Sequence, residues 1–327
     1  MTTPEGKVVA VTGASGYIGS RLLQRLEIEP GLRKTVAFDT RPLAAPIHNI
    51  AAYRRNLSEP IHQDLSDQNV NTLVHLAFNS RRGTNRREVT AIREENMGIL
   101  RNVLESCLRS HVEHLVYLSS HTVYGAHQDN PVPITEDTPL RPAVDFPYGY
   151  DKYQSELLLE EFGQAQPDFK ITILRPSVVL GPAASTAVTN AFFKPWLLGV
   201  LDYNPPLQFV YDEDLARVLA IVIMRGLPGV FNVAGSGVVY YRELAKAIDS
   251  KLIRLPPFLA YPATQLAWDL GLQKHATAGG LDLIRWPILL STAKLHQATS
   301  YRFWHTSMEA VTAFANANYL YKDPVAI

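Results

Sequence analysis

The 327-residue chain has one cysteine, no excess of either charge, and no long uninterrupted hydrophobic run. The single Cys107 excludes an internal disulfide, and its apolar helical surroundings predict a packed thiol rather than a nucleophile. Lysine plus arginine and aspartate plus glutamate both number 31, so the chain lacks the basic excess of a nucleic-acid-binding surface. No apolar run is long enough for a membrane span, no signal peptide opens the sequence, and the histidines show no metal-ligand spacing. We therefore expect a cytoplasmic protein with no metal, no nucleic-acid partner and no membrane span.

The glycines near the start of the chain are its most informative feature. An apolar run from Lys7 ends in Gly13, Gly16 and Gly19, and an amphipathic segment follows. This order predicts a strand, a tight turn and a helix. Gly13 allows the turn, Gly16 lets the backbone approach a bound group, and Gly19 lets the helix pack on the strand. The N-terminus of such a helix offers free N–H groups to a pyrophosphate, so the motif predicts a dinucleotide site.

A second predicted strand, Thr35–Phe38, ends at Asp39. An acidic residue about 20 positions beyond the glycines accepts hydrogen bonds from the ribose hydroxyls of NAD. A carboxylate there also repels a 2′-phosphate, so Asp39 favours NAD over NADP. Arg41 could weaken that preference, because a guanidinium suits a phosphate. The alternative is that Asp39 is only a turn former at the end of a strand.

Strand-like and helical patterns alternate through the first half of the chain. Predicted strands at 73–77, 115–120 and 170–174 alternate with predicted helices at 88–109 and 149–163. This alternation predicts an α/β fold, a Rossmann-type doubly wound parallel sheet with a smaller, mixed C-terminal substrate lobe. We expect an NAD-binding domain over residues 1–176 and a substrate-binding lobe over 177–327, interleaved with the first domain around 205–235. The apolar stretch 255–272 is a lid or core helix of that lobe, or else a substrate wall or a membrane-surface contact.

Tyr148 and Lys152 are four residues apart, so on a helix they share one face. An unperturbed tyrosine has a pKa of about 10 and is a poor base at neutral pH. A nearby ammonium favours the phenolate, which could exchange a proton with a substrate hydroxyl. Ser120 lies at the carboxyl end of a predicted strand, where parallel sheets bind ligands, and its hydroxyl could orient the substrate oxygen. An exposed helix pair is the alternative for Tyr148 and Lys152.

As a set, these motifs resemble the extended short-chain dehydrogenase/reductase superfamily, often called NAD-dependent epimerase/dehydratases. The resemblance covers residues 7 to about 250 well and the rest poorly. The matching segments are Thr12-Gly13-x-x-Gly16-x-x-Gly19, Asp39, Asp64-Leu65, His75-Leu76-Ala77, Asn96, Ser119–Gly125, Tyr148-x-x-x-Lys152, Leu174-Arg175-Pro176, Phe209–Ala216 and Phe231–Gly235.

The resemblance implies a catalytic group of Ser120, Tyr148 and Lys152, with Asp64 and Leu65 beside the adenine. The residues that it implies for NAD are Gly13, Ser15, Gly16, Tyr17, Ile18, Gly19, Asp39, Asp64, Leu65, Leu76, Ala77, Asn96, Tyr148, Lys152 and Pro176. The residues expected to contact a small-molecule substrate are Phe78, Ser119, His121, Thr122, Ser177 and Phe192.

The sequence departs from the sugar-nucleotide epimerases of this group at three places. These enzymes usually carry an asparagine shortly after Leu-Arg, an arginine before the Phe-Val-Tyr segment and a late Arg-x-Gly-Asp segment. Here the corresponding segments are Pro176–Val179, Pro206–Gln208 and Tyr301–Trp304. Because a diphosphate needs cationic or N–H partners, we expect a substrate other than an ordinary nucleotide-sugar, such as a less polar alcohol or ketone.

Four arginines follow the third predicted strand near the expected rim of the active site: Arg81, Arg82, Arg86 and Arg87. They could hold an anionic substrate. Because Glu88, Glu94 and Glu95 follow, a solvated loop and helix of mixed charge is favoured.

Two classes of function remain open. The first is an NAD-dependent oxidoreductase of the epimerase/dehydratase type that transfers a hydride at a secondary alcohol or ketone carbon, with Tyr148 as acid/base. It would be an epimerase, or a dehydrogenase resembling 3β-hydroxysteroid dehydrogenases or ketone reductases; a dehydratase ranks lowest, because His121-Thr122 replaces the usual Asp-Glu pair. The second class is a non-catalytic NAD-binding sensor or assembly protein. The resemblance also implies a homodimer that pairs helices 88–109 and 149–163.

Overall fold

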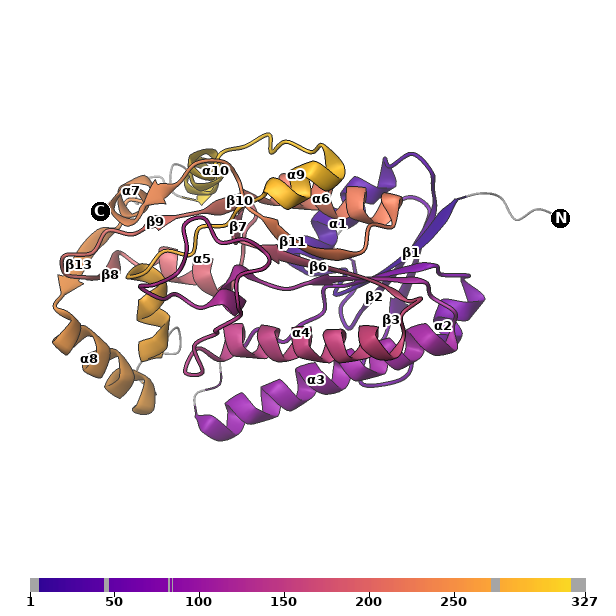
Figure 1. The fold of residues 1–327 in the computed structure, drawn as a ribbon, viewed down its shortest axis with the longest axis horizontal. Helices are drawn as coiled ribbons and strands as arrows, with labels where there is room; N and C mark the ends of the chain where they lie inside the picture. The colour runs from indigo at the N-terminus through magenta and orange to yellow at the C-terminus, as the bar shows by residue number, and fades with distance from the viewer. Residues whose placement is uncertain (1–5, 44–46, 82, 84, 272–276, 319–327) are drawn as a thin grey trace, which may run out of the picture.

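Seven strands form one parallel sheet in the order β11-β6-β5-β4-β1-β2-β3 (Figure 1). The computed structural model describes residues 6–43, 47–81, 83, 85–271 and 277–318. The strands of this sheet are β1 (Lys7–Thr12), β2 (Leu32–Asp39), β3 (Ile50–Arg54), β4 (Thr72–His75), β5 (His114–Leu118), β6 (Lys170–Pro176) and β11 (Gly229–Val233). The predicted doubly wound α/β fold is therefore confirmed.

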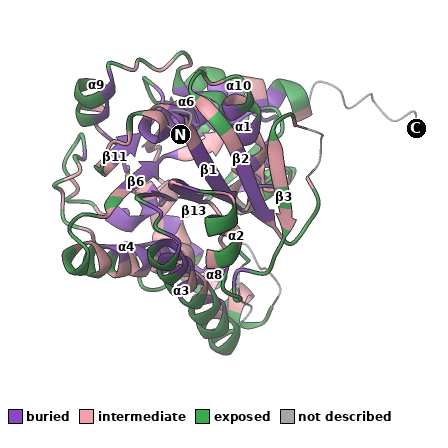
Figure 2. Cartoon of the chain, turned by 90° about the vertical axis from the view of Figure 1, so that its right-hand side faces the viewer, coloured by how far each residue is buried: buried purple, intermediate pink, exposed green. Residues whose placement is uncertain are grey.

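The alternation of side chains along β1 explains why helices cover both faces of the sheet. Val9 and Val11 pack into one apolar core with helices α1 and α6, whereas Val8 and Ala10 pack into a second core with α2, α3 and α4. Figure 2 shows the central strands buried and the outer faces of α3 and α4 exposed. The helices are α1 (Tyr17–Glu27), α2 (His62–Asp67), α3 (Arg86–Arg109), α4 (Pro147–Ala165) and α6 (Asp212–Arg225).

Local residues set the ends of these helices. The side chain of Asn85 accepts a hydrogen bond from the Glu88 N–H and caps the start of α3. Pro147 begins α4, at a position where its missing N–H has no intrahelical partner to lose. Gly226 ends α6 in the left-handed conformation, with φ of 59°.

The smaller lobe carries three two-stranded sheets. Their strands are β7 (Val178–Leu180) with β10 (Phe209–Tyr211), β8 (Trp196–Val200) with β13 (Lys251–Leu255), and β9 (Pro206–Leu207) with β12 (Val239–Tyr240). Its helices are α5 (Ala187–Phe192), α7 (Tyr241–Ala247), α8 (Pro257–Asp269) and α10 (Ser307–Asn318), with the 3-10 turn η2 (Ala278–Ile284). Helix α9 (Ala293–Thr299) packs against β11 of the main sheet, and the 3-10 turn η1 (His121–Tyr124) follows β5 and packs against α4. Between these elements the chain returns to the main sheet through α6 and β11. The division at residue 176 stays a prediction.

The apolar stretch at 255–272 forms the end of β13 and helix α8; residue 272 lies outside the described ranges. Ala260 and Thr264 face inward, whereas Phe258 and Leu266 are 73% and 59% exposed. This surface helix is compatible with a lid or a wall and not with a core helix. Across the described ranges, no helix is long and apolar enough to cross a membrane.

Candidate active site

The β1–α1 turn has the close packing that its glycines predict. Gly13 has a φ of 69°, and a Cβ there would lie 2.7 Å from the Ala77 nitrogen. A Cβ on Gly19 would lie 2.2 Å from the Gly13 carbonyl oxygen, so the helix approaches the turn as only glycine permits. Gly16 begins α1 without a side-chain cap. The first N–H groups of α1, which include those of Tyr17 and Ile18, can therefore bind an anion.

Asp39, at the end of β2, lies beside this turn. Its Oδ2 accepts the Ser15 N–H at 2.9 Å, and its Oδ1 accepts the Arg41 N–H at 2.9 Å. Each carboxylate oxygen keeps a second lone pair for another donor. The Arg41 side chain is 67% exposed, with its Nε 3.7 Å from Asp39 Oδ1. The turn thus holds a fixed carboxylate where a ribose hydroxyl is predicted.

The side chain of Tyr17 joins α1 to α6. Its hydroxyl donates to Asp212 Oδ2 at 2.8 Å, and Arg21 Nε donates to the same oxygen at 3.0 Å. Burial raises the pKa of Tyr17, and the neighbouring Asp212 carboxylate raises it further. A contact of Tyr17 with NAD stays a prediction. The sequence could not predict the contact between Arg21 and Asp212, because the two residues lie far apart in the chain.

The two residues predicted beside the adenine have other contacts in this structure. The Asp64 carboxylate receives Arg55 Nε at 2.8 Å and an Arg55 Nη at 3.1 Å. Leu65 is fully buried in the core with α3. A role in NAD binding for either residue stays a prediction.

The loop after β4 is held against β1 and α3. The Leu76 N–H donates to the Thr12 carbonyl at 3.2 Å, and the Ala77 N–H to the Thr12 hydroxyl at 3.4 Å. Asn96 is buried in α3, where its Oδ1 accepts the Asn79 N–H at 2.8 Å and its Nδ2 donates to the Asn79 carbonyl at 3.1 Å. Asn96 therefore fixes the loop that follows Ala77. The predicted strand 73–77 ends at His75, because the chain turns there into this loop.

Lys152 is 5% exposed beneath the end of β5. Its Nζ donates to the Leu118 carbonyl at 2.7 Å and to the Tyr117 hydroxyl at 3.3 Å. The Phe78 ring lies over the same nitrogen, with its centroid 3.9 Å away. Burial lowers the pKa of Lys152 to about 7, while the Glu156 carboxylate opposes that change. The amine can thus exist in both charge states near neutral pH.

Tyr148 lies one turn before Lys152 on α4 and is half-buried. Its ring meets those of Phe78 and Phe146 edge to face, with centroid distances of 5.7 and 6.3 Å. Phe78 therefore contacts both Tyr148 and Lys152. The fold brings the predicted pair together on one side of α4.

Ser120 is 5% exposed at the start of η1, beyond the end of β5. Its Oγ accepts the Thr122 N–H at 3.2 Å and the Thr122 hydroxyl at 2.9 Å. Ser120 is the acceptor in both bonds, so its own O–H can donate to a bound molecule. Thr122 orients Ser120 in this arrangement.

Ser119 and His121 point to other partners. Ser119 donates to Glu156, whose carboxylate pairs with Arg175 at 2.6 Å inside the protein. Burial lowers the pKa of His121 to about 4, so the neutral ring donates through Nδ1 to the Pro176 carbonyl at 3.0 Å. The buried Glu156–Arg175 pair is a feature that our sequence analysis missed.

Ser177 and Phe192 complete the predicted substrate set. Ser177 is 3% exposed, and its Oγ has no hydrogen-bond partner among the described residues. Phe192 is 6% exposed and packs on Phe314, with ring centroids 6.0 Å apart, in the core of the smaller lobe. Phe192 therefore has a packing role and is not among the residues that line the pocket beside Tyr148 described below, and a contact with substrate stays a prediction.

A pocket opens beside Tyr148. Its lining is mainly apolar and comes from the loop after β4, the first turns of α3 and α4, and α8: Phe78, Arg81, Val89, Ile92, Phe146 and Trp268. The buried Asp151 at its edge is paired with Arg93 Nε at 2.5 Å. Trp268 joins this site from more than 100 positions along the chain, which is why no local motif identifies it.

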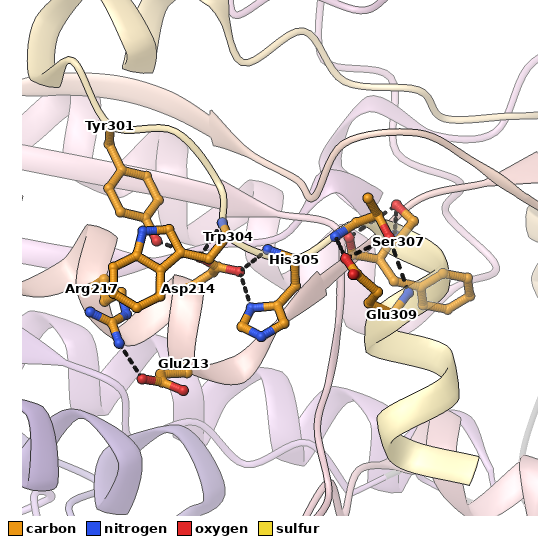
Figure 3. Close-up of polar contacts among 10 residues, drawn as sticks. Glu213, Asp214, Arg217, Tyr301, Trp304, His305, Ser307 and Glu309 are labelled. Atoms are coloured by element: carbon orange, nitrogen blue, oxygen red, sulfur yellow. Dashed lines mark hydrogen bonds and ion pairs between the residues drawn. The ribbon is translucent and has the colours of Figure 1, made fainter. Parts of the chain in front are cut away.

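Two of the places where the sequence departs from sugar-nucleotide epimerases, Gln208 and the segment Tyr301–Trp304, bind other parts of this protein. Asp214 of α6 is fully buried; it accepts the Tyr301 hydroxyl, the Trp304 and His305 N–H groups at 2.9 and 3.0 Å, and His305 Nδ1 at 2.8 Å (Figure 3). Gln208 is bonded to the Leu290 backbone, whose N–H it accepts at 2.6 Å.

Comparison with known proteins identifies the family. The sequence profile of the NAD dependent epimerase/dehydratase family matches residues 9–234, which is more than half of the chain. The chain belongs to this family. This confirms the resemblance to the extended short-chain dehydrogenase/reductases.

The individual relatives are distant. An uncharacterized protein of Mycobacterium tuberculosis is 26% identical over 261 residues, which cover 77% of this chain and 68% of the relative. A UDP-glucose 4-epimerase of Caenorhabditis elegans is 27% identical over 187 residues, 51% of this chain and 52% of that enzyme. Among solved structures, the Thermus thermophilus UDP-glucose 4-epimerase in complex with NAD superposes with a TM-score of 0.73 at 20% identity, covering 95% of this chain and 98% of that one. At this identity, the structural likeness establishes the fold alone.

Proposed function

We propose that this protein is an NAD-dependent enzyme that transfers a hydride at a secondary alcohol or ketone carbon, with Tyr148 as the acid/base. The proposal is supported by three contacts near the carboxyl end of β5, where such sheets bind ligands: Lys152 donates to the Leu118 carbonyl, Phe78 contacts both Lys152 and Tyr148, and Ser120 begins η1 just beyond that strand. When bound, NAD supplies the nicotinamide that accepts or returns the hydride.

The residues of the β1–α1 turn fit this cofactor. The uncapped start of α1 suits the pyrophosphate, and the carboxylate of Asp39 suits the ribose hydroxyls. A negative charge at Asp39 favours NAD over NADP. The Thermus thermophilus structure with NAD supports the same choice.

Each member of the catalytic group has a distinct task. Tyr148 exchanges a proton with the substrate oxygen. The ammonium of Lys152 favours the phenolate of Tyr148, and the Ser120 hydroxyl donates to the substrate oxygen and orients it. Thr122 is a positioning residue, because it acts through Ser120, whereas Phe78 packs against both Lys152 and Tyr148.

Epimerases and dehydrogenases share this chemistry and differ in what happens to the hydride. The name of the Caenorhabditis elegans relative supports an epimerase, in which the hydride returns to the same molecule. The apolar pocket supports a second candidate, a dehydrogenase of the 3β-hydroxysteroid or ketone-reductase type that acts on a less polar substrate.

Helices α3 and α4 lie side by side (Figure 1), and their outer residues Leu108 and Leu157 are 39% and 40% exposed, which suits the proposed homodimer.

The test compares Tyr148→Phe with Tyr150→Phe, a tyrosine two positions on that packs against Arg93. We expect Tyr148→Phe to bind NAD like wild type but to lose hydride transfer, measured as NADH formation or isotope transfer with panels of alcohols, ketones and UDP-sugars. Tyr150→Phe keeps both. Full turnover by Tyr148→Phe would refute the mechanism. Mass spectrometry of nucleotide released from the denatured protein separates the candidates, because tightly retained NAD supports an epimerase and an empty site a dehydrogenase.

A further inference from the structure

The pocket beside Tyr148 contains one charge without an opposite partner. Among its described lining residues, Asp151 is neutralised by Arg93, whereas no carboxylate lies within ion-pair distance of the exposed Arg81. Burial raises the pKa of Asp151, and the Arg93 guanidinium opposes that shift. Among the lining residues that the structure describes, the pocket therefore combines an apolar surface with the one unpaired cation of Arg81.

The guanidinium of Arg81 is held in place by the same loop that reaches the catalytic group. Asn79 Oδ1 accepts the Arg81 N–H at 3.1 Å and Arg81 Nε at 3.4 Å. The backbone of Asn79 is in turn held by two hydrogen bonds to Asn96, and Asn79 Nδ2 donates to Glu95 at 2.6 Å. Because Asn79 occupies Nε alone, the two terminal nitrogens of Arg81 can receive an anion.

Aromatic residues line the pocket from its Tyr148 end to α8. Phe78 contacts Tyr148 at the catalytic end of the pocket, and Trp268 contributes from α8. Flat rings pack well on such surfaces, where aromatic contacts add to the hydrophobic gain. The positions that sugar-nucleotide epimerases use for the diphosphate are occupied here by Gln208 and the Tyr301–His305 segment, which bind the protein itself.

We propose that the substrate of this pocket is an amphipathic secondary alcohol or ketone, with a flat apolar body and a carboxylate or similar anionic group. Its carbinol or carbonyl carbon lies at Tyr148, its body packs among Phe78, Phe146 and Trp268, and its anion binds Arg81. This inference rests on the proposed function, whose substrate class it specifies. Arg81 is then a specificity-determining residue, since it binds the substrate away from the reacting atoms.

The test measures binding by calorimetry to the full chain saturated with NAD. The probes are a naphthalene secondary alcohol that carries a carboxylate, its neutral methyl ester, and UDP-glucose. We expect the acid to bind about tenfold more tightly than the ester, the usual effect of a charge-assisted hydrogen bond. Arg81→Gln removes this preference and Arg81→Lys restores part of it. Arg87→Gln, an equal charge change at an exposed residue outside the pocket lining, keeps it.

Trp268→Ala weakens binding of the acid and the ester alike, because both lose the same apolar contact. Equal binding of acid and ester to wild type, failure of both to bind, or tighter binding of UDP-glucose would each overturn the proposal. These outcomes are independent of turnover. If the acid binds as expected but Tyr148→Phe remains fully active, the proposed mechanism fails and the binding inference stands. If Tyr148→Phe abolishes turnover of a UDP-sugar and the acid does not bind, the proposed mechanism stands and the binding inference fails.

Discussion

The buried amine of Lys152 makes the stability of the folded protein depend on pH. Burial lowers its pKa from 10.5 to about 7. Between these two values the unfolded chain binds more protons than the folded chain, so stability rises with pH across this window. Replacing Lys152 with methionine removes this pH dependence.

The size of the effect follows from the two pKa values. The full difference corresponds to about 5 kcal/mol, of which about 2 kcal/mol is recovered between pH 7 and pH 9. The lost hydrogen bonds of Lys152→Met to Leu118 and Tyr117 add a cost that is nearly independent of pH. The informative quantity is therefore the slope of the stability difference against pH.

Urea unfolding of wild type and Lys152→Met at several pH values between 7 and 9 measures that slope. We expect the wild type to gain about 2 kcal/mol relative to the variant. Lys246→Met, which removes an exposed lysine of α7, is the matched control and follows the wild-type slope. Parallel curves for wild type and Lys152→Met would refute the account of Lys152 as a buried, proton-releasing amine.

Three further predictions concern stability. Gly19→Ala places a Cβ against the Gly13 carbonyl, so we expect it to lower the free energy of unfolding by about 1–3 kcal/mol and to weaken NAD binding. The control Gly98→Ala adds a Cβ in open space on α3 and raises the free energy of unfolding by about 0.5–1 kcal/mol. Equal effects of the two substitutions in urea titrations would contradict this prediction. Burial lowers the pKa of His75 from 6.5 to about 3, so stability is lost as pH falls through that range, and His75→Gln should flatten the acid limb of a stability–pH curve. Asp214→Asn sets an amide against the donors of Figure 3 and costs about 2–3 kcal/mol, with earlier proteolysis after residue 300; unchanged cleavage kinetics would argue against this network.

Features that depend on neighbours in the chain could be predicted from the sequence. The spacing of Gly13 and Gly19 specifies a turn in which a Cβ on Gly19 would meet the Gly13 carbonyl oxygen, and the separation of Tyr148 from Lys152 specifies a shared helix face. The alternation of apolar segments likewise predicted the parallel sheet. These are consequences of local geometry, which tertiary contacts did not change.

Features that depend on residues far apart in the chain emerged only from the tertiary structure. Sequence patterns carry no record of distance in space, so they did not reveal that Trp268 reaches the pocket of Tyr148 or that Asp214 binds the Tyr301–His305 segment. They also could not place Phe192 in the core of the smaller lobe, because an aromatic side chain suits a core and a substrate wall equally well. The sequence by itself therefore determined the fold, the family and the catalytic group that we propose. Packing between distant segments decided the shape and charge of the pocket, because the tertiary contacts determine which side chains pair with one another and which face the pocket.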